Sequence, residues 1–409
     1  MLETMRVVSF CHYLQGPAAS QYLADMGADV IKVEPPKGAF ERHWAGAKAF
    51  VGDDRVSAFF LCANRNKRSF AVDLKRPEAR EIVHRLIEGA DVVLENFRVG
   101  VMDRLGFGYE EVRKRKPDII YASGTGFGGS GPMVHRPGQD LIIQALSGLV
   151  AATGTPERPT PVGCAAADQH GAALLAMGIV AAYVKRLQTG RGTRIDGSLL
   201  NAGIDLQTEP LTLYFSKGAD SSAFARDPHL GTWFHEAPYG VYRLADGRFV
   251  ALSMNDAGRL AAALGSAQLE RLRDVDRYDE RDLYARTVAE ELAGRTFEDL
   301  APALDAHGIW YAPVQSYDEL RDDPQVRHNR VFREIEVGGG ARAVLVNHPL
   351  RYDGEVPGLR RMPLRIGQDT REVLAALGYA EAEIDALIED NIVIAPDDAA
   401  RAATGETEP

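Results

Sequence analysis

Short runs of β-branched and aromatic residues alternate with stretches of helical spacing in the first third of the chain, and this alternation constrains the fold most strongly. The runs predict five strands, at Arg6–Phe10, Asp29–Glu34, Phe70–Leu74, Asp91–Glu95 and Ile119–Ser123. The stretches between them predict helices at Pro17–Met26, Pro77–Glu88 and Tyr109–Lys116. Strand, crossover helix and strand repeated in this way produce a parallel sheet with helices on both faces. The sequence therefore predicts an α/β fold of the doubly wound, Rossmann-like type.

The pattern changes beyond residue 140. Asp140–Leu187 is rich in Ala, Gly and Leu, which predicts a long helix packed closely on its neighbours. Tyr239–Leu252 holds two alternating runs around Asp246-Gly247, which predicts a hairpin. A chain of 409 residues is long enough for two or three domains. We expect a large Rossmann-like domain at 1–216, a smaller α+β domain at 217–330, a return of 331–395 to the large domain, and a tail at 396–409.

Composition excludes several classes of protein. Apolar residues make up 45% of the chain, which is ordinary for a folded protein, and 47 Lys+Arg against 58 Asp+Glu give a net charge of −11. A chain this acidic is not expected to bind nucleic acid. The apolar run Gly171–Val184 is 14 residues long and predicts a buried helix, because a membrane span needs about 20. We therefore expect no membrane partner.

The three cysteines, Cys11, Cys62 and Cys164, lie far apart and form no CxxC pair. We expect reduced thiols rather than a zinc site or a disulfide framework, and no metal. The N-terminal segment has an early acidic residue and an apolar run too short for a signal peptide. These features predict a cytoplasmic protein.

A glycine-rich loop, Ser123–Pro132 (SGTGFGGSGP), follows the fifth predicted strand. A dinucleotide fingerprint belongs in the first strand–helix unit and runs directly into a helix, whereas this loop does neither. An NAD-dependent oxidoreductase is therefore an alternative that only the fold pattern supports. A loop that lines a ligand cleft at the carboxyl ends of the strands is the better interpretation.

Asp168 lies in Gly163–Gly171 (GCAAADQHG), immediately before the apolar run. One interpretation is a helix N-cap, a position that Asp fills well. The other is a catalytic carboxylate, since backbone N–H groups at a helix N-terminus stabilise negative charge. The residues alone leave both interpretations open, and His170 is either an acid–base group or an ordinary surface histidine.

Basic residues cluster in this acidic chain at Asn64–Arg68 with Lys75-Arg76, and at Arg98 with Arg104. Such clusters are usually solvated and paired with surface carboxylates. The alternative is a site for phosphate groups.

Motifs across nearly the whole chain resemble the class III CoA-transferase family of the CaiB/BaiF type, which includes formyl-CoA transferase, carnitine CoA-transferase and α-methylacyl-CoA racemase. The matching segments are QGPAASQYLADMGADVIKVEPP (Gln15–Pro36), NRNKRSFAVDLKRPEAR (Asn64–Arg80), ADVVLENFRVGVMDRLGFGYEEV (Ala90–Val112), GTGFGGSGP with GQDLIIQALSG (within Gly124–Gly148), ADQHGAALLAMGIVAAYVKRLQTGRGTRIDGSLLNA (Ala167–Ala202) and IGQDTREVLAALG (Ile366–Gly378). Their order and spacing together are specific.

The resemblance implies a large domain built from both chain ends, a smaller domain, and a homodimer whose chains interlock like links. It implies acyl-CoA and an organic acid as substrates, with no permanently bound cofactor. Asp168 matches the family's catalytic aspartate, and Gln15 matches a glutamine near the thioester. The residues that fall where the family holds CoA are Lys67, Arg68, Lys75, Asn96, Phe97 and Arg104. The implied route passes through an aspartyl anhydride and an aspartyl-CoA thioester.

The racemase branch of the family requires a second acid–base group beside the aspartate. This sequence has Gln139 there, and glutamine cannot take up a proton at neutral pH, which favours a transferase over an α-methylacyl-CoA racemase or epimerase. A CoA-binding protein without catalysis is a further alternative.

Several residues are candidates for contacts with the acids. The four-glycine run of formyl-CoA transferases is absent, so formate is not the expected substrate. His229–Tyr239 is a candidate cover over the active site, with His235 and Glu236 as contacts, and Trp44 is a further candidate beside the substrate. Either Arg42 or Arg136 is a candidate for holding a second carboxylate; both are otherwise ordinary solvated arginines.

Overall fold

The structure is a computed structural model that describes residues 1–53 and 55–396. The chain divides into two compact units. Unit 1 contains Met1–Ile143, Ala165–Leu206 and the segment that begins at Pro324, and unit 2 contains Gln144–Cys164 and Gln207–Asp323. We expected the smaller domain to start at 217 and the return at 331. Most of the expected tail lies outside the described residues.

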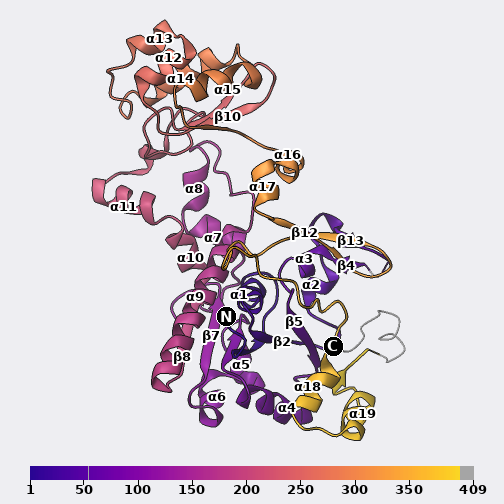
Figure 1. The fold of residues 1–409 in the computed structure, drawn as a ribbon. Helices are drawn as coiled ribbons and strands as arrows, with labels where there is room; N and C mark the ends of the chain where they lie inside the picture. The colour runs from indigo at the N-terminus through magenta and orange to yellow at the C-terminus, as the bar shows by residue number, and fades with distance from the viewer. Residues whose placement is uncertain (54, 397–409) are drawn as a thin grey trace. The chain divides into compact units, whose positions relative to one another are not determined.

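A seven-stranded sheet forms the centre of unit 1 (Figure 1). Its strands are β1 (Arg6–Phe10), β2 (Asp29–Glu34), β5 (Lys67–Val72), β6 (Val92–Glu95), β7 (Ile120–Thr125), β8 (Thr193–Ser198) and β14 (Val393–Ile394), in the order β14-β5-β2-β1-β6-β7-β8. All neighbours pair in parallel except β14, which is antiparallel to β5. The six parallel strands, counted along the chain, have the spatial order 3-2-1-4-5-6, so the order reverses between β1 and β6. The predicted α/β class is confirmed.

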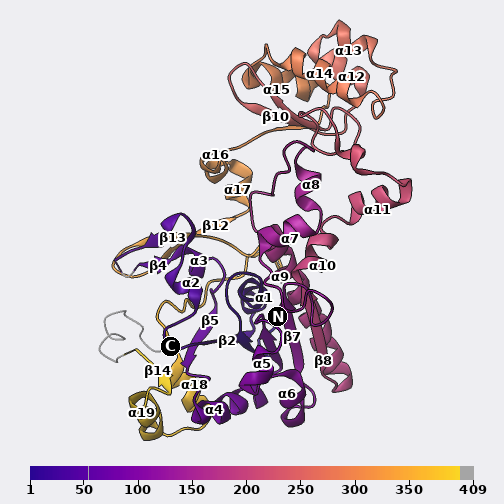
Figure 2. The same cartoon turned by 180° about the vertical axis from the view of Figure 1, so that it is seen from behind.

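Successive residues of the central strands enter different cores. Val7 packs into a cluster with helices α1 (Gln15–Asp25) and α9 (Ala166–Thr189), while Val8 packs into a cluster with α4 (Pro77–Glu88). Because both faces of the sheet are covered at its centre, β1 (RVVSF) and β6 (VVLE) are mostly apolar, which is why they were visible in the sequence. Helices α6 (Tyr109–Arg115), α18 (Thr370–Ala376) and α19 (Glu381–Glu389) lie near α4 (Figure 2).

The remaining elements of unit 1 are short. They are α2 (Phe40–His43), a 3-10 turn (Gly46–Lys48), β3 (Phe50–Val51), β4 (Val56–Ser57), α3 (Ala58–Leu61), α5 (Val101–Leu105), α10 (Leu199–Asp205), α17 (Pro324–His328), β12 (Phe332–Glu336) and β13 (Arg342–Val346). The segment after Pro324 is tied to the sheet by buried polar contacts. Arg65 binds Asp25 and donates from Nη1 to Val346 O at 2.6 Å, and Ser69 N donates to Asp369 Oδ2 at 2.7 Å.

The long helix predicted in the region around residues 140–187 is confirmed as α9. Two shorter helices precede it, α7 (Asp140–Leu146) and α8 (Leu149–Thr153). Gly148 adopts a left-handed conformation with φ +85°, which separates α7 from α8. Within the part of the chain that the structure describes, no helix combines the length and the apolar character that crossing a membrane requires.

Unit 2 contains a three-stranded antiparallel sheet of β9 (Gly240–Arg243), β10 (Phe249–Leu252) and β11 (Tyr311–Pro313). The predicted hairpin is β9 and β10, and Gly247 has φ +82° in its turn. Besides α8, the helices of this unit are α11 (Thr208–Lys217), a 3-10 turn (Ser221–Phe224), α12 (Ala257–Leu264), α13 (Ala267–Arg271), α14 (Arg281–Leu292), α15 (Phe297–Ala306) and α16 (Tyr317–Asp322).

Candidate active site

A cavity of about 630 Å³ lies in unit 1 at the point where the strand order reverses. The loop after β1 contributes His12–Gln15, the loop after β6 contributes Asn96–Val99, and the end of β7 contributes Gly124–Phe127. Its other lining residues are Phe40, Trp44, Phe59, Val134, Arg136, Pro137, Gly138, Gln139, Asp140, Leu141, Ala165, Asp168 and Leu199. Doubly wound sheets bind ligands at this place, outside the carboxyl ends of the strands.

Asp168 reaches this cavity from the first turn of α9. It is not the N-cap residue, because α9 begins at Ala166 and Ala165 precedes it. Asp140 does the capping instead, since its Oδ1 accepts hydrogen bonds from Ala167 N at 2.8 Å and Asp168 N at 3.1 Å. The capping interpretation of Asp168 is therefore wrong. The Asp168 side chain is left free for chemistry beside a helix N-terminus.

The pKa of Asp168 is raised to about 7. Burial is the main cause, because the apolar surroundings disfavour a charged carboxylate, and the negative charge of Asp140 adds to the effect. A carboxyl group with a pKa near neutrality in a cleft is a physical sign of a functional site. The shift lowers the ionised fraction of Asp168 at neutral pH but still leaves a substantial part of it as the carboxylate.

Gln15 is the first residue of α1 and is 3% exposed. Its amide lies between two glycines: an added Cβ would be 2.8 Å from Oε1 at Gly124 and 2.6 Å from Nε2 at Gly171. Nε2 is buried and has no hydrogen-bond partner among the described residues. A buried donor without a partner costs about 1–3 kcal/mol, which a carbonyl oxygen of a ligand would offset.

The loop after β1 is held by side chains of three other elements. Asn96 accepts from His12 N at 2.9 Å and donates to His12 O at 2.8 Å, so its amide group is occupied by the loop backbone. Tyr13 N donates to Glu41 at 3.2 Å, and Glu41 forms a fully buried ion pair with Lys32 at 2.8 Å. These contacts stabilise Tyr13 at φ +61°, a strained conformation for a non-glycine residue.

Aromatic rings form one wall of the cavity. Phe40 lies 5.1 Å from Tyr13 and 6.1 Å from Trp44, and Trp44 lies 5.0 Å from Phe59, measured between ring centroids. His12 continues this series, since its ring lies 4.9 Å from Tyr13 and 5.0 Å from Phe97. Sequence reasoning identified Trp44 and Phe97 but missed the other rings, because isolated aromatic residues carry no motif.

The predicted CoA-binding residues do not all reach the cavity. Asn96 and Phe97 line it, whereas Lys67, Arg68, Lys75 and Arg104 do not. Lys67 is 1% exposed, and its ammonium group donates to Pro17 O, Ala63 O and Asn64 Oδ1 at 2.7–2.9 Å. Burial lowers its pKa well below the ordinary value for lysine. A CoA contact of Lys67 does not fit this structure, because all three of its donors are occupied.

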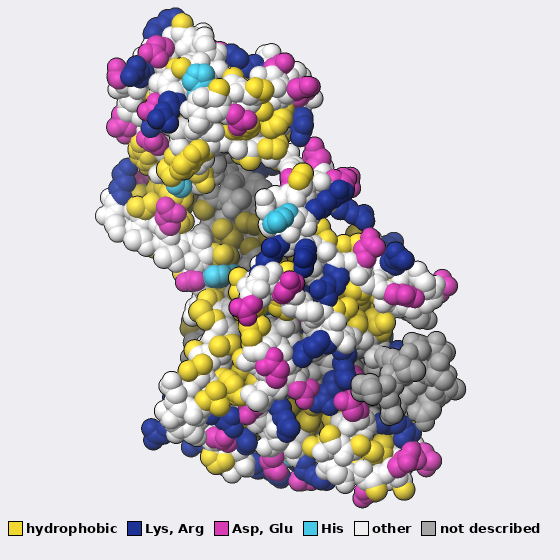
Figure 3. Space-filling model, in the orientation of Figure 1, with side chains coloured by type: hydrophobic (Ala, Val, Ile, Leu, Met, Phe, Trp, Pro, Cys, Tyr) yellow, Lys and Arg dark blue, Asp and Glu magenta, His cyan; other side chains and the backbone are white. Residues whose placement is uncertain are grey.

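The other three basic residues differ in their availability. Arg68 donates to Asp29 Oδ1 at 3.0 Å and to Glu372 at 3.2 Å. Lys75 and Arg104 are exposed and follow the carboxyl ends of β5 and β6. On the face shown in Figure 3, Lys and Arg side chains lie among Asp and Glu side chains.

The remaining predicted site residues fall in both units. Gln139 is exposed and lines the Asp168 cavity. His235 and Glu236 belong to unit 2, where the His235 ring stacks on Tyr239 at 4.2 Å and Glu236 binds Arg277 at 2.5 Å. Their role as a cover stays a prediction.

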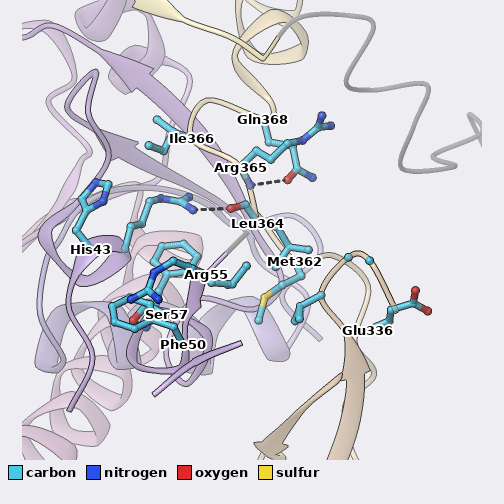
Figure 4. A pocket seen from close by; sticks show the side chains of 16 residues that line it. His43, Phe50, Arg55, Ser57, Glu336, Met362, Leu364, Arg365, Ile366 and Gln368 are labelled. Carbon is cyan, nitrogen blue, oxygen red and sulfur yellow. Dashed lines mark hydrogen bonds between the residues drawn. The ribbon is translucent and has the colours of Figure 1, made fainter. Parts of the chain in front are cut away.

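A larger cavity of about 1130 Å³ in unit 1 has a different character (Figure 4). Arg42, one candidate for holding a second carboxylate, borders it. Its guanidinium binds Glu34 through two contacts of 2.7 Å, donates to Leu364 O at 3.0 Å and lies 3.8 Å over the Phe60 ring. Arg42 is therefore committed to the fold and does not fit the proposed role.

A metal site is not apparent: within residues 1–53 and 55–396, no three His, Cys, Asp or Glu side chains gather as ligands.

A model of CoA-transferase family III matches residues 2–370. The chain belongs to CoA-transferase family III. A succinate–glutarate CoA-transferase of Agrobacterium fabrum is 33% identical, covering 93% of this chain and 96% of its own length. A succinyl-CoA:glutarate CoA-transferase of Mus musculus is 32% identical, covering 96% and 90%. A crystal structure of a CaiB/BaiF family protein from Brucella suis superimposes with a TM-score of 0.78 at 28% identity, covering 92% of this chain and 98% of that one.

The family III enzyme therefore acts in the transfer of CoA between acyl-CoA thioesters and acids. This result favours the transferase over the nicotinamide-dependent and non-catalytic alternatives.

Proposed function

We propose that this enzyme moves CoA from an acyl-CoA to a free carboxylic acid, with Asp168 as the nucleophile. The observation that carries the proposal is the Asp168 carboxyl group, which lies in the cavity and has a pKa near 7. This carboxyl group does not cap α9, because Asp140 accepts the hydrogen bonds from the N–H groups of the first turn. Gln15 Nε2 supplies a donor for the thioester oxygen at the same cavity.

In the first half of the reaction, a carboxylate oxygen of Asp168 attacks the thioester carbonyl carbon. The C–S bond breaks, CoA leaves as the thiolate, and a mixed anhydride of Asp168 and the donor acyl group forms. The thiolate then attacks the Asp168 carbonyl carbon of the anhydride. The donor acid leaves as a carboxylate, and Asp168 carries CoA as a thioester.

The second half reverses these steps with the acceptor. The acceptor carboxylate attacks the Asp168 carbonyl carbon and expels the CoA thiolate. The thiolate attacks the acceptor carbonyl of the new anhydride, which forms the product thioester and restores the Asp168 carboxylate. No net proton is exchanged, and water must be kept from both intermediates.

The raised pKa of Asp168 helps the first step. An ordinary Asp carboxylate has a pKa about 4–5 units below that of a thiol, so expelling a thiolate with it is strongly unfavourable. At a pKa of about 7 most of that difference is removed. The basicity of the nucleophile then comes close to that of the leaving group.

We assign the CoA side of the cavity to the loop after β6. Asn96 holds the wall, Phe97 presents its ring, and Arg98 is exposed at the cavity. Lys75 and Arg104 are exposed and follow β5 and β6, which flank β2 and β1 in the sheet, and their charges suit the phosphate groups. The CoA thioester is a substrate here, and no permanently bound cofactor is part of the proposal.

We also propose the interlocked homodimer that the family resemblance implies. The outer face of α9 presents Ala173, Met177 and Val184, and Met177 is 64% exposed. A helix that is apolar on its outer face needs a partner surface. The proposal includes a cytoplasmic location, with Cys11, Cys62 and Cys164 as free thiols.

The acid itself is not fixed by similarity. Relatives at about 30% identity include a succinate–glutarate and an acetyl-CoA:oxalate CoA-transferase, and also an (R)-2-hydroxy-4-methylpentanoate CoA-transferase. The racemase alternative is not favoured, since Gln139 lines the cavity where a second proton-transfer group is required.

Mass spectrometry of the enzyme incubated with a panel of acyl-CoAs tests the proposal. Trapping with hydroxylamine or borohydride should modify Asp168 in the wild type and leave Asp168→Asn unmodified. The acyl-CoA that gives the adduct identifies the donor. No adduct with any donor, together with exchange of the α-proton in deuterated water, would replace the transferase by a racemase.

A further inference from the structure

Arg136 is a free cation at the Asp168 cavity. It lines the cavity, its side chain is exposed, and its guanidinium has no hydrogen bond or ion pair within the described part of the chain. Three buried or partly buried arginines of unit 1 are paired instead: Arg42 with Glu34, Arg65 with Asp25, and Arg186 with Asp91. An unpaired guanidinium at a reaction cavity indicates an anionic ligand.

The backbone fixes Arg136 close to the reacting carboxyl group. Arg136 precedes Asp140 by four residues, which limits their Cα atoms to about 14 Å apart. Asp140 in turn caps the helix turn that carries Asp168. The intervening Gly138 packs against the end of β7, since an added Cβ there would meet Gly126 Cα at 2.6 Å. The segment from Arg136 to Asp140 therefore cannot move away from the end of β7 without breaking the contact between Gly138 and Gly126.

One carboxylate of the substrate acid takes part in the reaction at Asp168. A second carboxylate on that acid requires a cation at the same cavity, and Arg136 lines the cavity together with Asp168. The aromatic wall of Phe40, Trp44 and Phe59 offers apolar surface to the methylene groups between the two charges. Arg98, the other free arginine of the cavity, follows Phe97 on the side assigned to CoA.

We propose that the enzyme acts on a short dicarboxylic acid, of succinate to adipate size, and that Arg136 binds the carboxylate that does not react. This inference rests on the proposed function. It adds the substrate class and a specificity-determining residue to it.

The test compares acceptors of equal chain length with one acyl-CoA donor. Succinate, glutarate and adipate are paired with butyrate, valerate and hexanoate, and the ratio of kcat/KM within each pair is measured, so that effects on the donor cancel. The wild type should favour the dicarboxylate of at least one pair. Arg136→Gln should lower that ratio by about 10- to 100-fold, mainly through KM of the dicarboxylate, and Arg136→Lys should retain part of it.

Two variants serve as controls. Arg55→Gln changes an exposed arginine that stacks on Phe50 at the larger cavity, and it should leave the ratio unchanged. Arg98→Gln should raise KM for the acyl-CoA without changing the ratio. If Arg136→Gln weakens both acids equally or acts on KM of the acyl-CoA, Arg136 serves CoA or the fold, and the inference is overturned.

A wild type that transfers CoA but prefers monocarboxylates also overturns the inference, while the proposed function stands. A wild type that transfers CoA to no acid removes the proposed function itself, and the inference with it.

Discussion

Two cavities of unit 1, the larger beside Arg42 and the smaller around Asp168, differ in the charged groups that they hold. At the larger cavity Arg42 is paired with Glu34, and Glu34 also accepts from Ser69 Oγ at 2.7 Å. At the smaller cavity the Gln15 amide and the Arg136 guanidinium have no partner in the described chain, and Asp168 and Asp140 repel each other. Volume alone would select the larger cavity. The larger cavity also holds a buried donor without a partner in the described chain, Arg365 Nη1, so unpaired donors alone do not separate the two. What distinguishes the smaller cavity is the raised pKa of Asp168 at the point where the strand order reverses.

The largest effect is expected at the smaller cavity, where the Asp168→Asn substitution should abolish CoA transfer. The amide cannot attack a thioester, so kcat should fall by at least about 10⁴-fold in a steady-state assay with the identified donor. Circular dichroism and gel filtration serve as controls for the fold. Residual transfer within 10-fold of wild type would show that another group is the nucleophile.

Gln15→Ala should lower kcat by about 10²- to 10³-fold, as the loss of one oxyanion donor does. Thermal stability should stay close to that of the wild type, because Nε2 has no hydrogen-bond partner to lose among residues 1–53 and 55–396. Single-turnover rates would separate this effect from weaker binding. An unchanged kcat with a lower melting temperature would assign Gln15 to packing.

Glu34→Gln tests the other cavity and should act on stability. Removing one partner of a buried ion pair leaves Arg42 uncompensated, so the free energy of unfolding should fall by about 3–5 kcal/mol. Urea denaturation measures the loss. The folded fraction should keep kcat within several-fold of wild type, and a loss of activity at full stability would contradict the contrast between the cavities.

Asp168→Asn should also be more stable than the wild type at neutral pH. The folded-state pKa of Asp168 is raised, so ionisation costs the folded state free energy that is absent below about pH 4, grows as the pH rises, and is complete above about pH 7. The variant lacks this cost and should melt a few degrees higher at pH 8, with the difference vanishing near pH 4. A constant difference across that range would point to packing.

The smallest effect is expected for Asp140→Asn. In the wild type, kcat/KM should rise with pH up to a plateau above about 7, because only ionised Asp168 attacks. The asparagine Oδ1 still accepts the two N–H groups but carries no charge, so the midpoint should move to lower pH. A midpoint that does not move would leave burial as the only cause of the raised pKa.

The sheet could be predicted from the sequence because its strands are buried on both faces. Arg6–Phe10 and Asp29–Glu34 form strands with the predicted bounds, since continuous β-branched runs have no competing interpretation. The cluster at Asn64–Arg68 was harder to interpret. Lys67 and Arg68 are neighbours on β5 and point to opposite faces, so one is buried and the other is partly exposed.

The candidate site was only partly predictable for a related reason. Asp168 and Gln15 were identified through the family resemblance, but the cap on α9 comes from Asp140, 28 residues earlier in the chain. Composition likewise gives no sign that Gln144–Cys164 belongs to unit 2. Contacts between distant segments decide such features, and a single sequence carries no periodic signal for them.

The position of Gln15 between Gly124 and Gly171 has a consequence for how the enzyme tolerates mutation. A methyl group at either glycine would push the amide out of its place; at Gly171 its next neighbour is Ala202 Cβ at 3.4 Å, whereas at Gly124 it would also lie 2.9 Å from Leu175 Cδ1 in the core. A library selected only for folded protein should therefore accept alanine at Gly171 more readily than at Gly124, and a library selected for CoA transfer should reject alanine at both. Part of the reaction centre is thus encoded by two residues that have no side chain.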